Sequence, residues 1–307
     1  MSTEQIYAPP TPVTSERHKS RRPTRTLWSV RKTSGRVALY ILVALFVVVT
    51  LGPIYWIVLS AFTPISELFT SPLHYIPQHP SLVNFQTVAQ VVPLFQMFMN
   101  SVVLSVLSAS LSVVVCLLAA YSFARIPFPG RNVLFLGLLL SSYLPTIAMI
   151  IPLFQMFQSL SLLDSLQGLV ILLVSFLLPT SVWIMTSFVR QIPIELEEAA
   201  QIDGANFLST LWHVIVPVLR PSIATLFLIN LVTSWQEFFF PLIFSRSGAS
   251  ATLTLGITQA AVNPQYQTVA WGNEAAMALI VIAPVFILAI IFQKQIIEGL
   301  MAGSLKG

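Results

Sequence analysis

Six long apolar segments restrict this chain to a membrane fold. They lie near residues 37–61, 96–124, 132–158, 167–189, 219–243 and 273–293. A helix of about 20 apolar residues crosses the roughly 30 Å of hydrocarbon in a bilayer. Lipid offers backbone groups no hydrogen-bond partners, and the segments lack the regular alternation of a membrane barrel. We therefore expect an all-α, polytopic membrane protein with six transmembrane helices.

The composition agrees with this expectation and excludes a soluble domain. Of the 307 residues, 56% are hydrophobic and only 8% are charged, whereas soluble domains carry about a quarter charged residues. The single cysteine, Cys116, lies in an apolar run, so the chain can form neither an internal disulfide nor a cysteine metal cluster. We expect Cys116 to pack as an inert side chain.

Residues 1–36 form a basic arm before the first apolar segment. The arm carries eight of the fifteen Lys and Arg residues together with Pro9, Pro10, Pro12 and Pro23. It has few large apolar side chains to offset the entropy of ordering, so we expect it to be disordered. The uncharged stretch that follows is too long for a signal-peptide core and predicts a retained first span. Because most of the positive charge belongs to the arm, nucleic-acid binding is not indicated.

The distribution of basic residues predicts the orientation of the helices. Membrane proteins retain Lys and Arg on the cytoplasmic side. Fourteen of the fifteen lie in the arm, in the second-to-third and fourth-to-fifth connections, or after residue 293, and only Arg246 lies on the other face. We therefore expect residues 37–307 to form one transmembrane domain with both termini in the cytoplasm, including a C-terminal tail at residues 294–307.

Three prolines lie inside the apolar segments. Pro145 and Pro152 lie in the third segment and Pro179 lies in the fourth. Proline removes a backbone donor and clashes with the preceding turn, so these positions are predicted to kink or break the helices.

The connection at residues 190–217 is charged in a protein that otherwise avoids charge. It reads RQIPIELEEAAQIDGANFLSTLWHVIVP. Glu195, Glu197 and Glu198 would lie in the first turns of a helix, where negative charge complements the helix dipole. Gly204 would end that helix. A second short helix is expected at residues 205–216, stopped by Pro217.

This connection is predicted to bind a partner protein. Ala199 and Ala200 are small enough to let a partner surface approach the helix closely, while Glu198 and Asp203 can pair with its basic groups. The alternative is an interfacial helix that rests on lipid headgroups. An anionic inner leaflet would repel the closely spaced glutamates, which favours the partner protein.

At these residues the chain resembles the permease subunits of ATP-binding-cassette (ABC) importers. Their cytoplasmic loop carries Glu-Ala-Ala, three residues, Gly, nine residues, and then Ile-x-Leu-Pro. Here Glu198–Ala200 is followed by Gly204 at that spacing, and Pro217 closes the motif. Val214 and Val216 stand where Ile and Leu are usual.

Three further stretches resemble the carbohydrate-uptake branch of that family, the maltose-permease type. They are AAYSFAR at residues 119–125, SWQEFFFPL at 234–242 and GLMAGSLKG at 299–307. Gln236 stands where Asn is usual, and Met301 where Thr is usual. The resemblance covers nearly all of the chain after the arm. It implies a type I ABC importer permease fold in a prokaryotic plasma (inner) membrane.

The resemblance also implies partners for this subunit. These are a second homologous permease, with which it would form a heterodimer in the membrane lipid, two ATP-binding cassette subunits and an extracytoplasmic sugar-binding protein. The loop that couples to the ATPase would comprise Glu198, Ala199, Ala200, Asp203, Gly204 and Pro217. The chain contains no G-x-x-x-x-G-K-[ST] motif. We therefore expect the ATPase subunits to bind ATP and Mg²⁺. We do not expect this chain to be an enzyme or to bind a cofactor or metal.

Polar residues within the apolar segments are candidates for the substrate pathway, because such residues usually face a cavity or the bundle interior. They are Asn100, Ser101, Tyr143, Asn230, Trp235, Gln236 and Glu237. An aromatic ring beside amide and carboxylate groups suits a sugar. Three alternatives remain open: Glu237 at the outer interface, Trp235 in an aromatic belt, and Asn230 joining helices by hydrogen bonds.

The function implied is import of a sugar or oligosaccharide by alternating access. A glycerol phosphate, a polyol or another small solute is the nearest alternative cargo. An ion-coupled carrier would need buried charges, and Glu237 is the obvious acid within a span. A membrane enzyme is disfavoured, because all four histidines fall outside the expected bilayer core.

Overall fold

The computed structural model describes residues 26–72, 74–261 and 269–304, and the elements in this part of the chain are helices. The chain divides into two units, residues 1–54 and residues 55–307. Within the described residues, five helices are long and apolar enough to cross a membrane, or six if one bent pair counts as a span.

The first unit contains most of α1 (Thr26–Phe62). Its apolar part, Arg36–Phe62, is long enough to cross a membrane, and side chains such as Tyr40 and Phe46 are exposed, as on a helix that faces lipid. Residues 1–25 of the expected disordered arm lie outside the described residues. Residues 26–36, which we expected to belong to a disordered arm, form the start of α1. Extending an existing helix adds one hydrogen bond per residue, and no proline interrupts the chain between Pro23 and Pro53.

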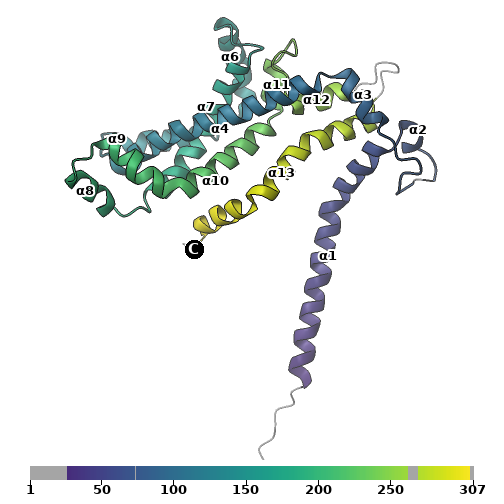
Figure 1. Ribbon diagram of the computed structural model, residues 1–307, viewed down its shortest axis with the longest axis horizontal. Coiled ribbons are helices and arrows are strands. Elements are labelled where there is room, and N and C mark those ends of the chain that lie inside the picture. Colours follow the sequence, from purple (N-terminus) through teal and green to yellow (C-terminus); the bar gives the residue numbers. More distant parts are fainter. Residues whose placement is uncertain (1–25, 73, 262–268, 305–307) are drawn as a thin grey trace, which may run out of the picture. The chain divides into compact units, whose positions relative to one another are not determined.

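The second unit is a helical bundle built around α4 (Leu94–Arg125). The helix α4 packs against α7 (Leu166–Val189) and α10 (Val216–Trp235). In turn, α10 packs against α13 (Trp271–Ser304), as Figure 1 shows. Small buried residues of α4, among them Ser105, Ser108 and Ala109, allow the helix backbones to approach closely. The expected tail continues α13 as far as Ser304.

The third apolar segment is two helices rather than one. α5 (Arg131–Ser141) and α6 (Thr146–Ser159) are bent by 96° at a short break. The break confirms the prediction at Pro145, which immediately precedes α6. Proline disfavours the helical conformation of the residue before it, so α5 cannot continue straight into α6. Pro152 and Pro179, in contrast, lie inside continuous helices.

The fifth apolar segment also differs from the expected 219–243. The span runs over residues 207–235 and comprises α9 (Phe207–Thr210), a π-helical segment η1 (Leu211–Ile215) and α10. After Trp235 the chain turns and forms α11 (Phe239–Phe244) and α12 (Leu253–Ala260). The apolar residues after Trp235 therefore belong to a separate short helix.

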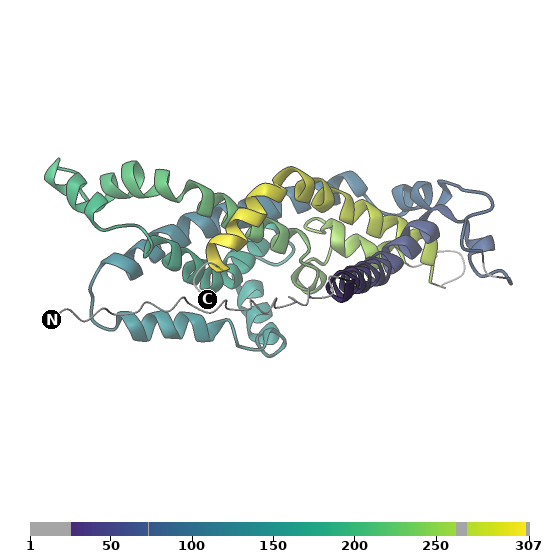
Figure 2. The same ribbon diagram turned by 90° about the horizontal axis from the view of Figure 1, so that it is seen from below.

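The two ends of this bundle carry different short helices. α8 (Glu195–Ile202) and α9 lie at one end, whereas α3 (Val83–Val91), α11 and α12 lie at the other, as Figures 1 and 2 both show. The four-residue helix α2 (Ile65–Leu68) lies near α3 at that second end. Cys116 is fully buried in a core cluster with Met185, Leu211 and Ile215, as expected for an inert packing residue.

Candidate functional site

The helix α8 ends at Ile202 and is capped by Gly204, the residue that the sequence predicts to end it. The amide of Gly204 donates to the carbonyl of Gln201 at 3.0 Å, and the amide of Ala205 donates to that of Ala200 at 2.9 Å. Together these bonds form a Schellman cap, which needs a residue with positive φ. Gly204 has a φ of +86°, and a Cβ at this position would meet no atom within 4 Å. Glycine is therefore required here by the backbone conformation and not by crowding.

The proposed docking surface of α8 is open. Glu198, Ala199 and Asp203 are exposed and Ala200 is half-buried. Among the described residues, the carboxylates of Glu198 and Asp203 have no ion-pair partner. Ile202 beside them is 87% exposed. Exposed carboxylates next to an exposed apolar side chain are a surface that a partner with basic and apolar groups can cover.

The second short helix does not stop at Pro217. The Asn206 side chain caps α9 by accepting a hydrogen bond from the Ser209 amide at 2.9 Å, and the chain then continues through η1 into α10. Pro217 lies in the first turn of α10. A proline is tolerated in the first turn of a helix, where its fixed φ suits the helical conformation. The expected stop was wrong. The connection at residues 190–217, called the elbow below, runs directly into the fifth span.

Glu197 is the functional candidate that the sequence analysis missed. Its Oε1 lies 2.6 Å from Nε of Arg125, and its Oε2 accepts a hydrogen bond from the Tyr121 hydroxyl at 3.0 Å. Nη2 of Arg125 also donates to the carbonyl of Ile192 at 2.7 Å. The side chains of Arg125 and Glu197 are only 14% and 5% exposed. A buried ion pair thus joins α8 to the last turn of α4.

At the opposite end of the bundle, two substrate-pathway candidates hold a loop. The Asn100 amide nitrogen donates to the carbonyls of Ala249 and Ala251, both at 2.9 Å, and the Ser101 hydroxyl accepts from the Leu253 amide at 2.8 Å. Asn100 and Ser101 are buried. Their polar groups are therefore engaged in fixing the loop between α11 and α12.

Asp164, which the sequence analysis did not single out, fixes the same loop. Its carboxylate accepts hydrogen bonds from the amides of Arg246 and Ser247 at 3.1 and 3.0 Å, and from the Ser250 hydroxyl at 3.2 Å. Burial alone would raise the pKa of Asp164, but the hydrogen bonds from Ser247, Arg246 and Ser250 outweigh it and lower the pKa below 3.8. The loop is thus held by an ionised carboxylate.

Asn230 and Trp235 join helices. The Asn230 amide nitrogen donates to the hydroxyls of Ser112 in α4 and Ser181 in α7, and its oxygen accepts from the Ser181 hydroxyl. The Trp235 indole donates to the carbonyl of Val281 in α13 at 3.1 Å. All four side chains that make these bonds are buried. This geometry agrees with the helix-joining alternative for Asn230.

The remaining substrate-pathway candidates lie at turns. Oε1 of Glu237 accepts from the amides of Phe239 and Phe240 at 2.8 and 3.1 Å and so caps α11. Gln236 is exposed in the turn before it. Tyr143 is 83% exposed in the bend between α5 and α6.

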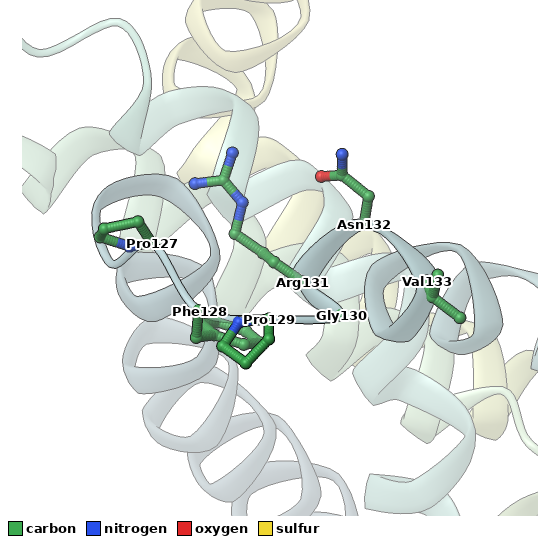
Figure 3. Close-up of a pocket in the computed structure, with 7 residues that line it drawn as sticks. All are labelled: Pro127, Phe128, Pro129, Gly130, Arg131, Asn132 and Val133. Carbon is green, nitrogen blue, oxygen red and sulfur yellow. The ribbon is translucent and has the colours of Figure 1, made fainter.

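Two surface hollows in the described part of the chain are lined by none of these candidates. A hollow of about 620 Å³ is lined by residues 127–133, in the connection between α4 and α5 and the start of α5. The side chains of Arg131 and Asn132 project from the start of α5 (Figure 3). A second hollow of about 460 Å³ lies between the end of α1 and the start of α13, beside Trp56, Trp271 and Glu274. Residues 36–72, 74–261 and 269–293 hold no group of three or more His, Cys, Asp or Glu side chains suited to a metal ion.

Comparisons with known proteins find membrane components of transport systems. Residues 112–300 match the family described as binding-protein-dependent transport system inner membrane component. The chain is 32% identical to the sulfoquinovosyl glycerol transport system permease protein SmoH of Agrobacterium fabrum over 277 residues, which is 89% of this chain and 95% of that protein. It is also 32% identical to the trehalose/maltose transport system permease protein MalG of Thermococcus litoralis over 274 residues, 89% of this chain and 97% of that protein.

A solved structure has the same fold. It is a chain of a bacterial ABC transporter involved in the import of the acidic polysaccharide alginate. The TM-score is 0.74 at 21% identity, and the match covers 86% of this chain and 97% of that chain.

Proposed function

The chain belongs to the family of binding-protein-dependent transport system inner membrane components, and we propose that its cargo is a sugar or a short oligosaccharide. As a member of that family it is a multi-pass permease subunit of an ABC importer and not an enzyme. Support for a sugar cargo comes from relatives named for trehalose and maltose, for trehalose alone and for diacetylchitobiose.

The observation that carries the coupling mechanism is the open acidic surface of α8. Its free carboxylates at Glu198 and Asp203, its small residues Ala199 and Ala200, and the cap at Gly204 suit insertion into a cleft of a separate ATPase subunit. Coupling in this proposal is mechanical, since the ATPase moves α8 and the helices joined to it. ATP can favour one arrangement of the permease only by differing in affinity for the two arrangements.

The proposed complex has four kinds of component around the cargo. This chain pairs with a second homologous permease, two ATPase subunits bind on the cytoplasmic side and hold ATP and Mg²⁺, and an extracytoplasmic sugar-binding protein delivers the cargo. The positions of fourteen of the fifteen Lys and Arg residues support an orientation with both termini in the cytoplasm. In that orientation the α8 elbow faces the ATPases, and the loop held by Asn100 and Asp164 faces outward.

The test is reconstitution of the complex. The chain is co-purified with the products of its chromosomal neighbours, placed in liposomes, and screened for sugars that stimulate ATP hydrolysis and accumulate inside. Glu198→Lys and Gly204→Asp are expected to leave membrane insertion intact but to detach the ATPase and abolish uptake. Stimulation by amino acids or metal ions alone would refute the sugar cargo, and unchanged transport in both variants would refute the docking role of α8.

A further inference from the structure

The helix α8 has little apolar packing of its own. Glu197 is its one buried residue, whereas apolar side chains on both sides of it, Leu196 and Ile202, are exposed. Hydrophobic burial therefore contributes little to the position of this helix. α8 also contacts η1 and α9, but its buried polar contact with the bundle is the one that Glu197 makes.

That contact comes from the last turn of α4. Both carboxylate oxygens of Glu197 are used, one by Arg125 and one by Tyr121. Arg125 in addition binds the carbonyl of Ile192, in the connection that leads from α7 to α8. The Tyr121 ring lies 4.9 Å from the ring of Phe207 in α9. The last turn of α4 thus contacts α8, the connection that precedes α8, and α9, which follows it.

The contact is suited to transmitting force rather than to adding stability. A buried ion pair repays the cost of removing two charges from water only in a narrow geometry, so it resists displacement while contributing little net stability. α4 in turn packs along α7 and α10 through much of its length. A displacement of α8 is therefore passed to the bundle through α4 instead of being absorbed by the connection at residues 190–194.

We propose that Arg125, Glu197 and Tyr121 are positioning residues that make α8 and the end of α4 move as one body during transport. The inference rests on the proposed function, in which a separate ATPase moves α8. It goes beyond that function by assigning the transmission step to three side chains that leave the docking surface untouched. Loss of the ion pair between Arg125 and Glu197 uncouples ATP hydrolysis from transport, while the ATPase subunit stays bound.

The experiment compares variants of the full complex in liposomes and measures sugar accumulated per ATP hydrolysed. Glu197→Gln removes the ion pair, and Glu195→Gln, on the same helix but exposed, is the matched control. Glu197→Gln is expected to retain the ATPase subunit while sugar accumulated per ATP falls at least about fivefold, the lower range of measured couplings. Glu195→Gln is expected to match the wild type. Exchanging the charges, with Arg125→Glu and Glu197→Arg together, is expected to restore part of the coupling.

A milder variant keeps the proposal testable if Glu197→Gln does not fold. Tyr121→Phe removes one hydrogen bond to Glu197 but preserves the ring against Phe207, and it is expected to lower sugar per ATP by about twofold. Unchanged sugar per ATP in both variants overturns the proposal. A loss of uptake that is fully matched by loss of bound ATPase or of folded permease also overturns it, because the role is then purely structural. Failure of the proposed function itself would appear in the wild-type complex, as absence of sugar-stimulated hydrolysis.

Discussion

The side-chain nitrogen of Asn230 in α10 lies 2.9 Å from the hydroxyl of Ser181 in α7 and 3.2 Å from that of Ser112 in α4. Three helices therefore share one buried hydrogen-bonded group, at a position where an isolated polar side chain in an apolar segment would suggest a cargo contact. The bonds satisfy the Asn230 amide within the chain. They assign it to holding the bundle together.

Asn230→Ala is expected to destabilise the purified permease by about 1 kcal/mol, the size of an interhelical hydrogen bond in a membrane protein. The measurement is unfolding in detergent with increasing SDS. Thr233→Ala is the control, since Thr233 is exposed on the same helix and its hydroxyl donates to the carbonyl of Ile229 within that helix. If instead the apparent affinity for cargo changes while stability does not, Asn230 contacts the cargo.

Asn100→Asp is expected to release the loop between α11 and α12. The carboxylate cannot donate to the carbonyls of Ala249 and Ala251, and it repels both of them. A local loss of about 1.4 kcal/mol makes opening about ten times more frequent, so trypsin should cleave after the exposed Arg246 about tenfold faster. Gln96→Ala removes only a bond of 3.5 Å to Ala249 and should leave the rate near that of the wild type. Equal rates in all three proteins would show that Asn100 does not fix this loop.

The pKa of Asp164 predicts how the same loop responds to acid. A carboxyl whose pKa is lowered in the folded state adds stability above its ordinary pKa of 3.8, and this stability is lost as the pH falls through the lowered value. Amide exchange at Ser247, corrected for its intrinsic rate, should therefore be slow and constant from about pH 5 to about pH 8 and accelerate only under stronger acid. Asp164→Asn should exchange faster over the whole range, with no acid transition. A transition near neutral pH would mean that another group controls the loop.

The apolar segments predicted the long helices of this fold but not the direction of each one. Hydropathy records which residues avoid water, and a broken segment is as apolar as a straight one. Pro145 and Pro152 both indicated a bend in the third segment, but the sequence did not show that the break lies at Pro145, and its angle of 96° depends on packing that no local pattern contains. The end of α10 at Trp235 was missed for the same reason, because the phenylalanines after it are equally apolar.

The sequence likewise predicted some parts of the candidate site and missed others. The elbow could be predicted because its signals are local: glutamates in one turn, and a glycine where the backbone needs a positive φ. The pair of Arg125 with Glu197 could not, since the two residues are 72 positions apart. A polar side chain in an apolar segment shows that a partner is needed, but it does not show whether the partner is a cargo or a neighbouring helix.

Gly272→Ala is expected to disturb the packing of Asn84 between residues 61–63 and the start of α13. A Cβ at position 272 would lie 2.6 Å from Nδ2 of Asn84. This nitrogen donates to the carbonyl of Ala61 in α1 and to that of Thr63 just after it, each at 2.9 Å. Overpacking of this kind costs about 1–3 kcal/mol, measured as a lower unfolding midpoint. Gly137→Ala is the control, because nothing lies within 4 Å of a Cβ there and alanine favours the helix. Equal midpoints for the two variants would mean that Asn84 can shift at little cost.

Ile202→Ser tests whether the open surface of α8 is covered by an ATPase. The side chain is 87% exposed, so its removal should leave the unfolding midpoint of the isolated permease unchanged. If the side chain is buried in the complex, losing it costs about 1.5–3 kcal/mol of binding, so the ATPase subunit should dissociate at least about tenfold faster. Gln201→Ser, a change at the adjacent exposed residue, separates this apolar contribution from a general disturbance of the helix. The measurement is the dissociation rate of the ATPase from immobilised permease, and equal rates for the two variants would place the contact elsewhere on the elbow.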